Sequence, residues 1–237
     1  MSLDTRVRLD ELQARYGLPP AASTVFARLL ELVAAEPASI TAIREPAEGV
    51  DAHIADSLAA LELAVVRRSG HIADLGSGAG FPGLALAIAL PDAQVSLVES
   101  VGRKTTFLAR VVEKLGLVNA DVVHARAEGW PEGLGRHDLV TARALAPLPV
   151  LLEYAAPLLA PGGTLVAWKG RLETSERADG AAAASILGLT EPVAQRVQPF
   201  PEARDRYLYI SSKVGRTPAG YPRRSVMARK RPLGASS

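Results

Sequence analysis

The sequence predicts an α/β fold with a mostly parallel sheet of seven strands that ends in an antiparallel hairpin. From His71 onward, short apolar runs that end in turn residues alternate with longer amphipathic segments, which is typical of strand–helix–strand units. The first of these runs leads into a glycine-rich turn at residues 74–80. Near the C-terminal end, only residues 201–205 separate two strand-like segments. That is too few for a parallel crossover and predicts antiparallel pairing.

Residues 1–70 are predicted to be an N-terminal helical extension, because apolar residues recur there every three or four positions. Ser23 or Thr24 is a suitable cap for the second helix of this extension, and Pro37 is expected to end it. A loop at residues 38–50 precedes the third helix. The predicted helices lie at 3–16, from 23 to about 36, and at 51–67.

The predicted sheet domain comprises residues 71–213, and residues 214–237 are expected to be an irregular basic tail. Three amphipathic helices connect the parallel strands and can cover the sheet. The predicted helices lie at about 83–90, 101–116 and 147–160. The predicted strands lie at 71–75, 94–99, 121–125, 137–142, 163–168, 193–199 and 206–212.

The composition indicates one main core, since 48% of the 237 residues are hydrophobic and folding at this length removes roughly 70–75% of the unfolded surface. Cysteine is absent, which excludes disulfides and thiolate metal sites. The four histidines are scattered in the sequence, so no metal is expected. No run approaches 18 apolar residues, and the first residues lack the pattern of a signal peptide. We therefore expect a cytoplasmic protein without a membrane partner.

The C-terminal part is basic, although the formal net charge of the chain is only +2. A basic segment favours a polyanion, because each neutralised phosphate releases condensed counterions. A merely solvated terminus is the alternative interpretation. No acidic residue follows Asp205, whereas the basic residues after it are Arg206, Lys213, Arg216, Arg223, Arg224, Arg229, Lys230 and Arg231.

The glycine-rich turn is the strongest functional motif. It follows a strand that ends at Asp74 and contains Gly76, Gly78 and Gly80, whose bare backbone lets a ligand approach closely. Residues 78–83 also match the dinucleotide fingerprint GxGxxG. The turn therefore predicts a nucleotide cofactor, either NAD or S-adenosylmethionine, unless it merely links a strand to a helix.

Two carboxylates favour S-adenosylmethionine over NAD. Glu99 ends the next strand and is placed to accept hydrogen bonds from a ribose, which both cofactors contain. Asp74 is expected to meet the ammonium group of a methionine moiety. With NAD, the same carboxylate would lie near a pyrophosphate, which repels it. The cofactor prediction is therefore S-adenosylmethionine.

Further candidate site residues follow the third and fourth strands. Ala127 and Glu128 come after the third strand, where this fold grips an adenine, although Glu128 is equally suited to a solvated helix start. Arg143 ends the fourth strand, in the crevice where open sheets bind ligands. A salt bridge at a strand end is the structural alternative for Arg143.

The absence of two sequence features restricts which atom could accept a methyl group from S-adenosylmethionine. Exocyclic amine methyltransferases commonly carry an Asn/Asp-Pro-Pro-aromatic loop after the fourth strand, and this chain has none. Methylation at carbon five of a pyrimidine needs a cysteine nucleophile, which is also absent. A ring nitrogen such as N7 of guanine already has a free lone pair, so alignment and exclusion of water suffice. The sequence thus favours a ring nitrogen as the acceptor.

These residues resemble a known family, the bacterial 16S ribosomal RNA guanine-N7 methyltransferases, also called glucose-inhibited division protein B. The resemblance covers nearly the whole chain, including the tail segment at 216–223. The motifs that carry it are Thr41-Ala42-Ile43-Arg44, His53-Ile54-Ala55-Asp56-Ser57-Leu58, residues 74–83, Glu99-Ser100, Arg103-Lys104, Phe107-Leu108, Arg143-Ala144 and Lys169-Gly170.

The resemblance implies a Rossmann-like class I methyltransferase that modifies N7 of one guanine in 16S rRNA, with the rRNA or the small ribosomal subunit as its partner. We expect the enzyme to be a monomer. The alternatives are an NAD-dependent oxidoreductase and a small-molecule methyltransferase with an incidental basic tail. The resemblance places the cofactor against Gly76, Phe81, Ala127, Glu128 and Arg143, with Asp74 and Glu99 in the roles given above.

The N-terminal motifs have no explanation in the cofactor half. We expect the helices to present Arg44, His53 and Asp56 at the mouth of the site, and His53 and Asp56 share one helical face. Arg143, His53 and Asp56 are therefore the candidate catalytic residues. An internal polar network that joins the two parts of the chain explains the N-terminal residues equally well. The candidate RNA-binding residues are Arg44, Lys169, Arg206, Arg223 and Arg224.

Overall fold

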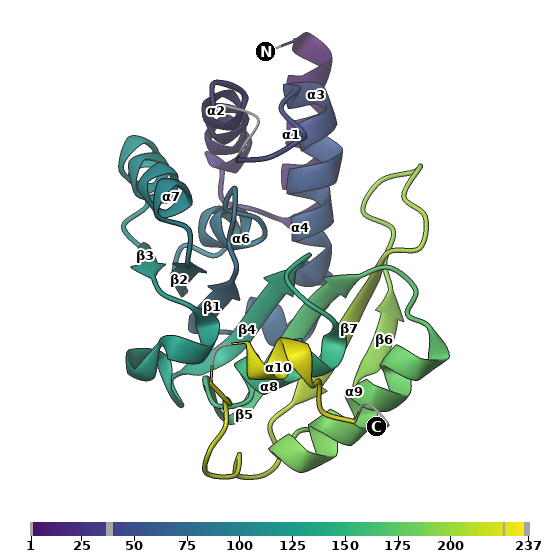
Figure 1. Ribbon diagram of the computed structural model, residues 1–237. Helices are drawn as coiled ribbons and strands as arrows, with labels where there is room; N and C mark the ends of the chain where they lie inside the picture. The colour runs from purple at the N-terminus through teal and green to yellow at the C-terminus, as the bar shows by residue number, and fades with distance from the viewer. Residues whose placement is uncertain (1, 37–39, 225, 235–237) are drawn as a thin grey trace.

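The computed structural model describes residues 2–36, 40–224 and 226–234, and one seven-stranded sheet forms its centre (Figure 1). The strands are β1 (His71–Leu75), β2 (Gln94–Glu99), β3 (Ala120–His124), β4 (His137–Arg143), β5 (Leu159–Lys169), β6 (Val193–Arg196) and β7 (Tyr207–Ser212). Their order across the sheet is β3-β2-β1-β4-β5-β7-β6. β1 to β5 are parallel, whereas β7 is antiparallel to both β5 and β6. The predicted fold class, with its antiparallel hairpin, is confirmed.

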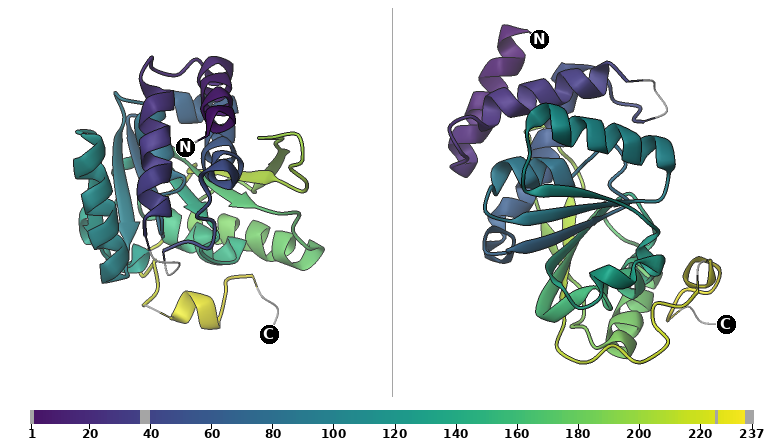
Figure 2. Two further views of the ribbon diagram at one scale, coloured as in Figure 1. Left: turned by 90° about the horizontal axis from the view of Figure 1, so that it is seen from above. Right: turned by 90° about the vertical axis from the view of Figure 1, so that its left-hand side faces the viewer.

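Helices cover both faces of this sheet (Figure 2). The helices that follow the sheet strands are α6 (Gly83–Ala89), α7 (Gly102–Leu115), α8 (Leu148–Ala155) and α9 (Thr174–Leu187). One hydrophobic core joins α6 and α7 to the N-terminal helices and contains Phe26, Ile54 and Leu97. The other core lies under α8 and α9 and contains Leu152 and Leu187. The N-terminal helices thus share a core with the sheet instead of packing by themselves.

The first two helices lie close to their predicted positions. α1 (Leu3–Tyr16) begins with a cap from Ser2, whose hydroxyl accepts a hydrogen bond from the Thr5 amide at 3.2 Å. α2 (Ala22–Ala34) begins earlier than predicted, and a cap at Ser23 or Thr24 is wrong. The Gln13 side chain instead accepts a hydrogen bond from the Ser23 amide at 2.9 Å. Pro37, the predicted end of this helix, lies outside the described residues.

The predicted single helix at 51–67 is a series of short turns of different kinds. The helical run begins earlier than predicted, at Pro46, so the predicted loop at 38–50 is wrong from that residue onward. The run consists of α3 (Pro46–Gly49), a π-helical segment (Val50–Ala55), α4 (Asp56–Leu58), a 3₁₀ turn (Ala59–Glu62) and α5 (Ala64–Arg67). The chain is extended at Leu63, which interrupts the run before α5. π-Helical turns are rare and are frequently found at functional sites. Here the π-helical segment carries His53 and leads directly into Asp56.

The C-terminal part differs most from the sequence prediction. α9 was not predicted, because its buried residues are mostly small and give no stripe of large apolar side chains. α8 ends at Ala155 rather than near 160, and β5 begins at Leu159, earlier than predicted. The tail expected to be irregular contains a short helix, α10 (Met227–Lys230), which lies beside α8. No helix among the described residues is long and apolar enough to cross a membrane.

Candidate functional site

The glycine turn lies where β1 ends and α6 begins. Gly76, Gly78 and Gly80 have φ values of 67°, 59° and 99°, in the left-handed region that disfavours side chains. A Cβ atom on Gly80 would lie 2.1 Å from Cδ1 of Leu84, so the close packing of turn and helix also requires glycine there. The carbonyl of Val98 on β2 accepts hydrogen bonds from the amides of Gly76 and Ser77. The turn therefore has a fixed shape determined by its neighbours.

The Asp74 side chain supports this turn from the interior of the protein. Its carboxylate is fully buried and accepts hydrogen bonds from the Thr141 hydroxyl at 2.9 Å and from the Gly83 amide at 3.1 Å. Burial raises the pKa of Asp74 to about 6, and the hydrogen bonds only partly oppose this. The expectation that Asp74 meets the cofactor's ammonium group directly does not fit this geometry, since no part of the carboxylate reaches the surface. Its place is beneath the turn, as a support.

Glu99 ties the turn to the end of β2. Its Oε2 atom accepts a hydrogen bond from the Gly78 amide at 3.0 Å, and its Oε1 atom accepts from the amides of Ser100 at 2.7 Å and Val101 at 2.9 Å. A carboxylate offers about four acceptor positions. One position on Oε2 therefore stays available to a ligand hydroxyl, which suits the predicted ribose contact but not a fully bidentate one.

A small cavity of about 60 Å³ lies between the turn and the segment after β3. It has room for only a few water molecules. Leu145, just after β4, covers the turn so closely that a Cβ atom on Gly76 would lie 2.7 Å from its Cδ1 atom. The structure thus brings together the predicted residues of this part of the site. The residues that line the small cavity include Gly76, Val98, Ser100, Ala127, Glu128 and Leu145.

Arg143 joins the sheet to the N-terminal helices. Its guanidinium donates hydrogen bonds to the Asp56 carboxylate at 2.9 Å and to the Ala52 carbonyl at 3.0 Å. Asp56 also forms an ion pair with Arg206, at 3.6 Å, from the start of β7. One buried carboxylate therefore holds two arginines, one at the end of β4 and one just before β7, in an internal network of the kind that the sequence left open as an alternative.

His53 is stacked on Phe81 of the glycine turn. The two rings are parallel, with an interplanar angle of 5° and centroids 4.5 Å apart. The Nε2 atom of His53 lies 3.1 Å from the Ile43 carbonyl, whereas its buried Nδ1 atom has no hydrogen-bond partner. Burial lowers the pKa of His53, so the ring is neutral at pH 7. His53 thus contacts the turn through its ring face.

A large cavity of about 420 Å³ opens at the carboxyl ends of β4 and β5. Its volume is within the usual range for small-molecule sites. Trp168 and Tyr207 supply aromatic surface, and the Trp168 indole donates a hydrogen bond to the Asp56 carbonyl at 2.8 Å. These two aromatic residues were missed in the sequence, although both are adjacent to predicted site residues in the chain. The charged residues that line the large cavity are Asp56, Arg143, Lys169 and Arg206.

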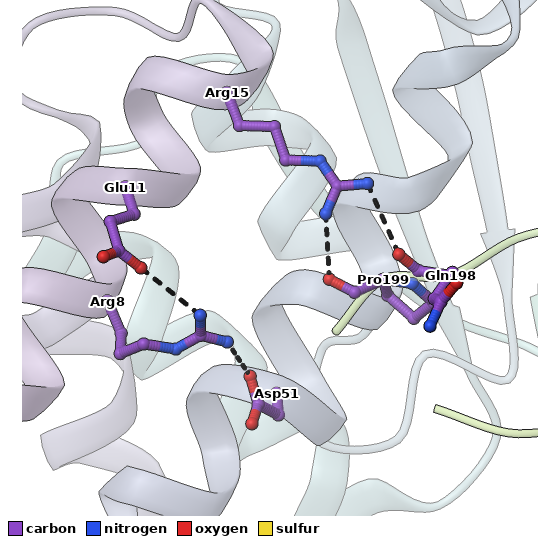
Figure 3. A network of polar contacts seen from close by, with 6 residues as sticks. All are labelled: Arg8, Glu11, Arg15, Asp51, Gln198 and Pro199. Atoms are coloured by element: carbon purple, nitrogen blue, oxygen red, sulfur yellow. Dashed lines mark hydrogen bonds and ion pairs between the residues drawn. The ribbon is translucent and has the colours of Figure 1, made fainter. Parts of the chain in front are cut away.

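The N-terminal helix contacts two segments that lead to residues of the large cavity, as Figure 3 shows. Arg15 donates hydrogen bonds to the carbonyls of Pro199 at 3.2 Å and Gln198 at 3.4 Å, in the loop that leads to Arg206. Arg8 forms an ion pair with Asp51 at 2.7 Å, at the π-helical segment that carries His53. α1 therefore holds two segments that flank lining residues of the large cavity in the chain, and it supplies no lining residue itself.

The predicted RNA-binding residues fall into three groups. Lys169 and Arg206 line the large cavity, and Lys169 also pairs with Glu176 at 2.8 Å. Arg44 lies outside the cavity and donates to the Ala34 carbonyl at 2.9 Å, while Arg224 is exposed.

Arg223 does not have the expected geometry. Its guanidinium is bound to the fully buried carboxylate of Glu153, at 2.5 Å and 2.9 Å. Because the guanidinium compensates this buried charge, its contacts are structural, and the prediction that Arg223 binds RNA is replaced by this role.

Solved structures of other proteins share the fold of this chain. The S-adenosylmethionine-dependent methyltransferase SibL matches 91% of this chain and 71% of its own, with a TM-score of 0.57 and 15% sequence identity. At this identity the likeness supports the fold alone.

Sequence relatives identify the family. The Ribosomal RNA small subunit methyltransferase G of Rubrobacter xylanophilus is 42% identical over 202 residues, which cover 83% of this chain and 77% of the relative. The protein of the same name from Chloroflexus aggregans is 37% identical, over 98% of this chain and 100% of the relative. Residues 24–200 match the family model of rRNA small subunit methyltransferase G, GidB. The resemblance in the motifs is thereby confirmed, and the chain belongs to the rRNA small subunit methyltransferase G family.

Proposed function

We propose that this chain transfers a methyl group from S-adenosylmethionine to N7 of a guanine in the 16S rRNA of the small ribosomal subunit. The observation that carries the proposal is the large cavity, which opens at the carboxyl ends of β4 and β5 and combines aromatic surface with three cationic side chains. Such a lining suits one nucleobase and the phosphates beside it. The ribosomal RNA substrate implies a cytoplasmic enzyme, and we propose that it acts as a monomer.

The glycine turn and the small cavity suit the cofactor. Left-handed glycines at positions 76 and 78 present bare backbone, and Glu99 retains one acceptor position for a ribose hydroxyl. Ala127 and Leu145 supply apolar surface for an adenine, beside Glu128. When bound, S-adenosylmethionine supplies a methyl group that its positively charged sulfur activates. Because the small cavity is narrower than an adenine needs, Leu145 must shift when the cofactor binds.

The large cavity suits the acceptor base. A base that reacts must leave its stack, and an unstacked purine then packs on aromatic side chains. Tyr207 lies at the edge of the cavity and is half-buried, so its ring is accessible to a base. Arg206 and Lys169 are positioned to attract the flanking phosphates. Arg143 connects the large cavity with the end of the glycine turn, since it lines that cavity and its guanidinium is 5.7 Å from the Phe81 ring.

The chemistry at N7 needs no general base. The lone pair of N7 forms the new bond to the methyl carbon while the bond from that carbon to sulfur breaks, and no proton is transferred. Catalysis therefore consists of alignment and the exclusion of water. The residues in the wall of the large cavity would therefore act by positioning the base, and not by compensating the positive charge of the product. Asp56, held by Arg143 and Arg206, is the carboxylate in the wall of the large cavity.

The test compares Arg206→Ala with Arg204→Ala, because both residues are exposed and lie close together before β7, but only Arg206 lines the large cavity. We expect Arg206→Ala to weaken binding of unmodified small-subunit RNA and to lower methyl transfer about tenfold, with S-adenosylhomocysteine affinity unchanged. Arg204→Ala should behave as the wild type. Equal effects of the two substitutions, or wild-type protein that is stabilised by NADH and not by S-adenosylhomocysteine, would contradict the proposed function.

A further inference from the structure

The C-terminal tail crosses α8 as a strap, which we define as residues 214–224 and 226–234. Its packing is specific: Ala228 of α10 is 1% exposed in the core under α8 and α9, and Tyr221 and Leu233 pack against the same core. Arg223 anchors the strap through its backbone amide and its guanidinium, which both bind the buried Glu153 carboxylate. The strap is therefore a docked part of the protein rather than a loose basic tail.

The strap brings one cationic side chain to the small cavity. Arg229 of α10 lines that cavity together with Gly76, Ala127 and Glu128, and its guanidinium donates a hydrogen bond to the Leu145 carbonyl at 3.2 Å. Tyr154 of α8 lies on the same side. Segments that are far apart in the sequence thus complete one wall, which neither the glycine turn nor the segment after β3 supplies.

Arg229 also holds the residue that covers the glycine turn. Leu145 follows Ala144, which has a φ of 53° although it is not a glycine. Residues other than glycine rarely adopt this left-handed conformation. The guanidinium of Arg229 donates its hydrogen bond to the carbonyl of the residue that follows. The guanidinium is accordingly fixed in the wall of the cavity and faces the place proposed for the adenine.

We propose that Arg229 is a cofactor-binding residue and that its planar guanidinium closes the adenine end of the site from the C-terminal strap. This inference rests on the proposed function. A guanidinium stacks on a purine face or donates to its ring nitrogens. The strap then contributes to cofactor affinity through Arg229, while Arg223 and Ala228 fix its position.

The experiment measures the rates of S-adenosylhomocysteine binding to full-length Arg229→Ala and to Lys230→Ala. Lys230 is the matched control, because it is an exposed cation on the same helix and does not line the small cavity. We expect Arg229→Ala to raise the dissociation constant about tenfold through a faster dissociation rate, as the loss of a stacked cation implies. Lys230→Ala should stay within about twofold of the wild type, and thermal unfolding without ligand should be alike for all three proteins.

A gain in cofactor affinity would mean that Arg229 obstructs the site and does not bind the cofactor. If Arg229→Ala speeds association and tightens binding, the side chain only obstructs the site, and the inference is wrong. Equal affinities for Arg229→Ala, Lys230→Ala and the wild type would also overturn it. Failure of the wild-type chain to bind S-adenosylhomocysteine would instead overturn the proposed function itself, so the two failures are distinct.

Discussion

The burial of Asp74 allows a quantitative prediction of how the free energy of unfolding depends on pH. Burial raises its pKa from 3.8 to about 6 in the folded protein, so between these values the folded state binds more protons than the unfolded state. The free energy of unfolding is therefore highest below the unfolded pKa and falls as pH rises through the folded pKa. When the pH has risen above both pKa values, this shift corresponds to a loss of about 3 kcal/mol in the free energy of unfolding.

Asp74→Asn should remove this loss. An asparagine has the same shape, its carbonyl can accept from the Gly83 amide, and the Thr141 hydroxyl can accept from its NH₂ group. Between pH 4.5 and pH 7.5 the stability of the variant relative to the wild type should rise by about 2 kcal/mol. Urea unfolding at both pH values measures this difference, with Asp121→Asn on the exposed edge strand as the control.

The same variant tests where Asp74 acts. Because its carboxylate is buried beneath the turn, Asp74→Asn should change S-adenosylhomocysteine affinity by less than about threefold. If the variant is at least as pH-dependent as the wild type, or if it loses about 2 kcal/mol at pH 7.5, the reasoning about the buried carboxylate is refuted. A large loss of cofactor affinity would return Asp74 to direct contact with the ammonium group.

Three further substitutions test other parts of the structure. Arg223→Ala leaves the buried Glu153 charge uncompensated, and urea unfolding should show a loss of about 3–5 kcal/mol, whereas a phosphate-contacting role would leave stability unchanged. Gly80→Ala, at a φ of 99° and in contact with Leu84, should lose at least about 2 kcal/mol, and wild-type stability would contradict the close packing of the turn. Asp56→Asn weakens the ion pairs of Asp56 with two arginines. Single-turnover methyl transfer should therefore slow about a hundredfold while the cofactor affinity is unchanged. An unchanged rate would contradict the role of Asp56 in positioning these arginines.

The sheet was predictable because its signals are local. The apolar runs, the glycine turn and the short spacing before β7 each lie within a few residues, and all three features appear in the structure. α9 escaped because its buried stripe consists of Gly180, Ala183, Ala184 and Leu187, which periodicity in large apolar residues does not detect. The helix predicted at 51–67 is interrupted at Leu63, where no glycine or proline marks the interruption in the sequence.

The site was predictable in position but not in detail. Asp74 and Glu99 were recognised as important acids, yet the amides that bind their carboxylates come from a turn whose path the sequence does not specify. Arg223 was assigned to RNA by its place in a basic tail, because nothing local indicates that Glu153, seventy positions earlier, is buried and needs a cation. Trp168 and Tyr207 both line the large cavity because β5 and β7 are neighbours in the sheet.

The central claim is that this chain methylates N7 of guanine in small-subunit RNA. The direct measurement incubates the protein with unmodified small-subunit RNA and methyl-labelled S-adenosylmethionine, digests the RNA to nucleosides and identifies the labelled nucleoside by mass spectrometry. We expect label in 7-methylguanosine, with about one methyl group per RNA, on free RNA or on the assembled subunit. Label on an exocyclic amine, on carbon or on a ribose, or no label on any form of the RNA, would contradict it.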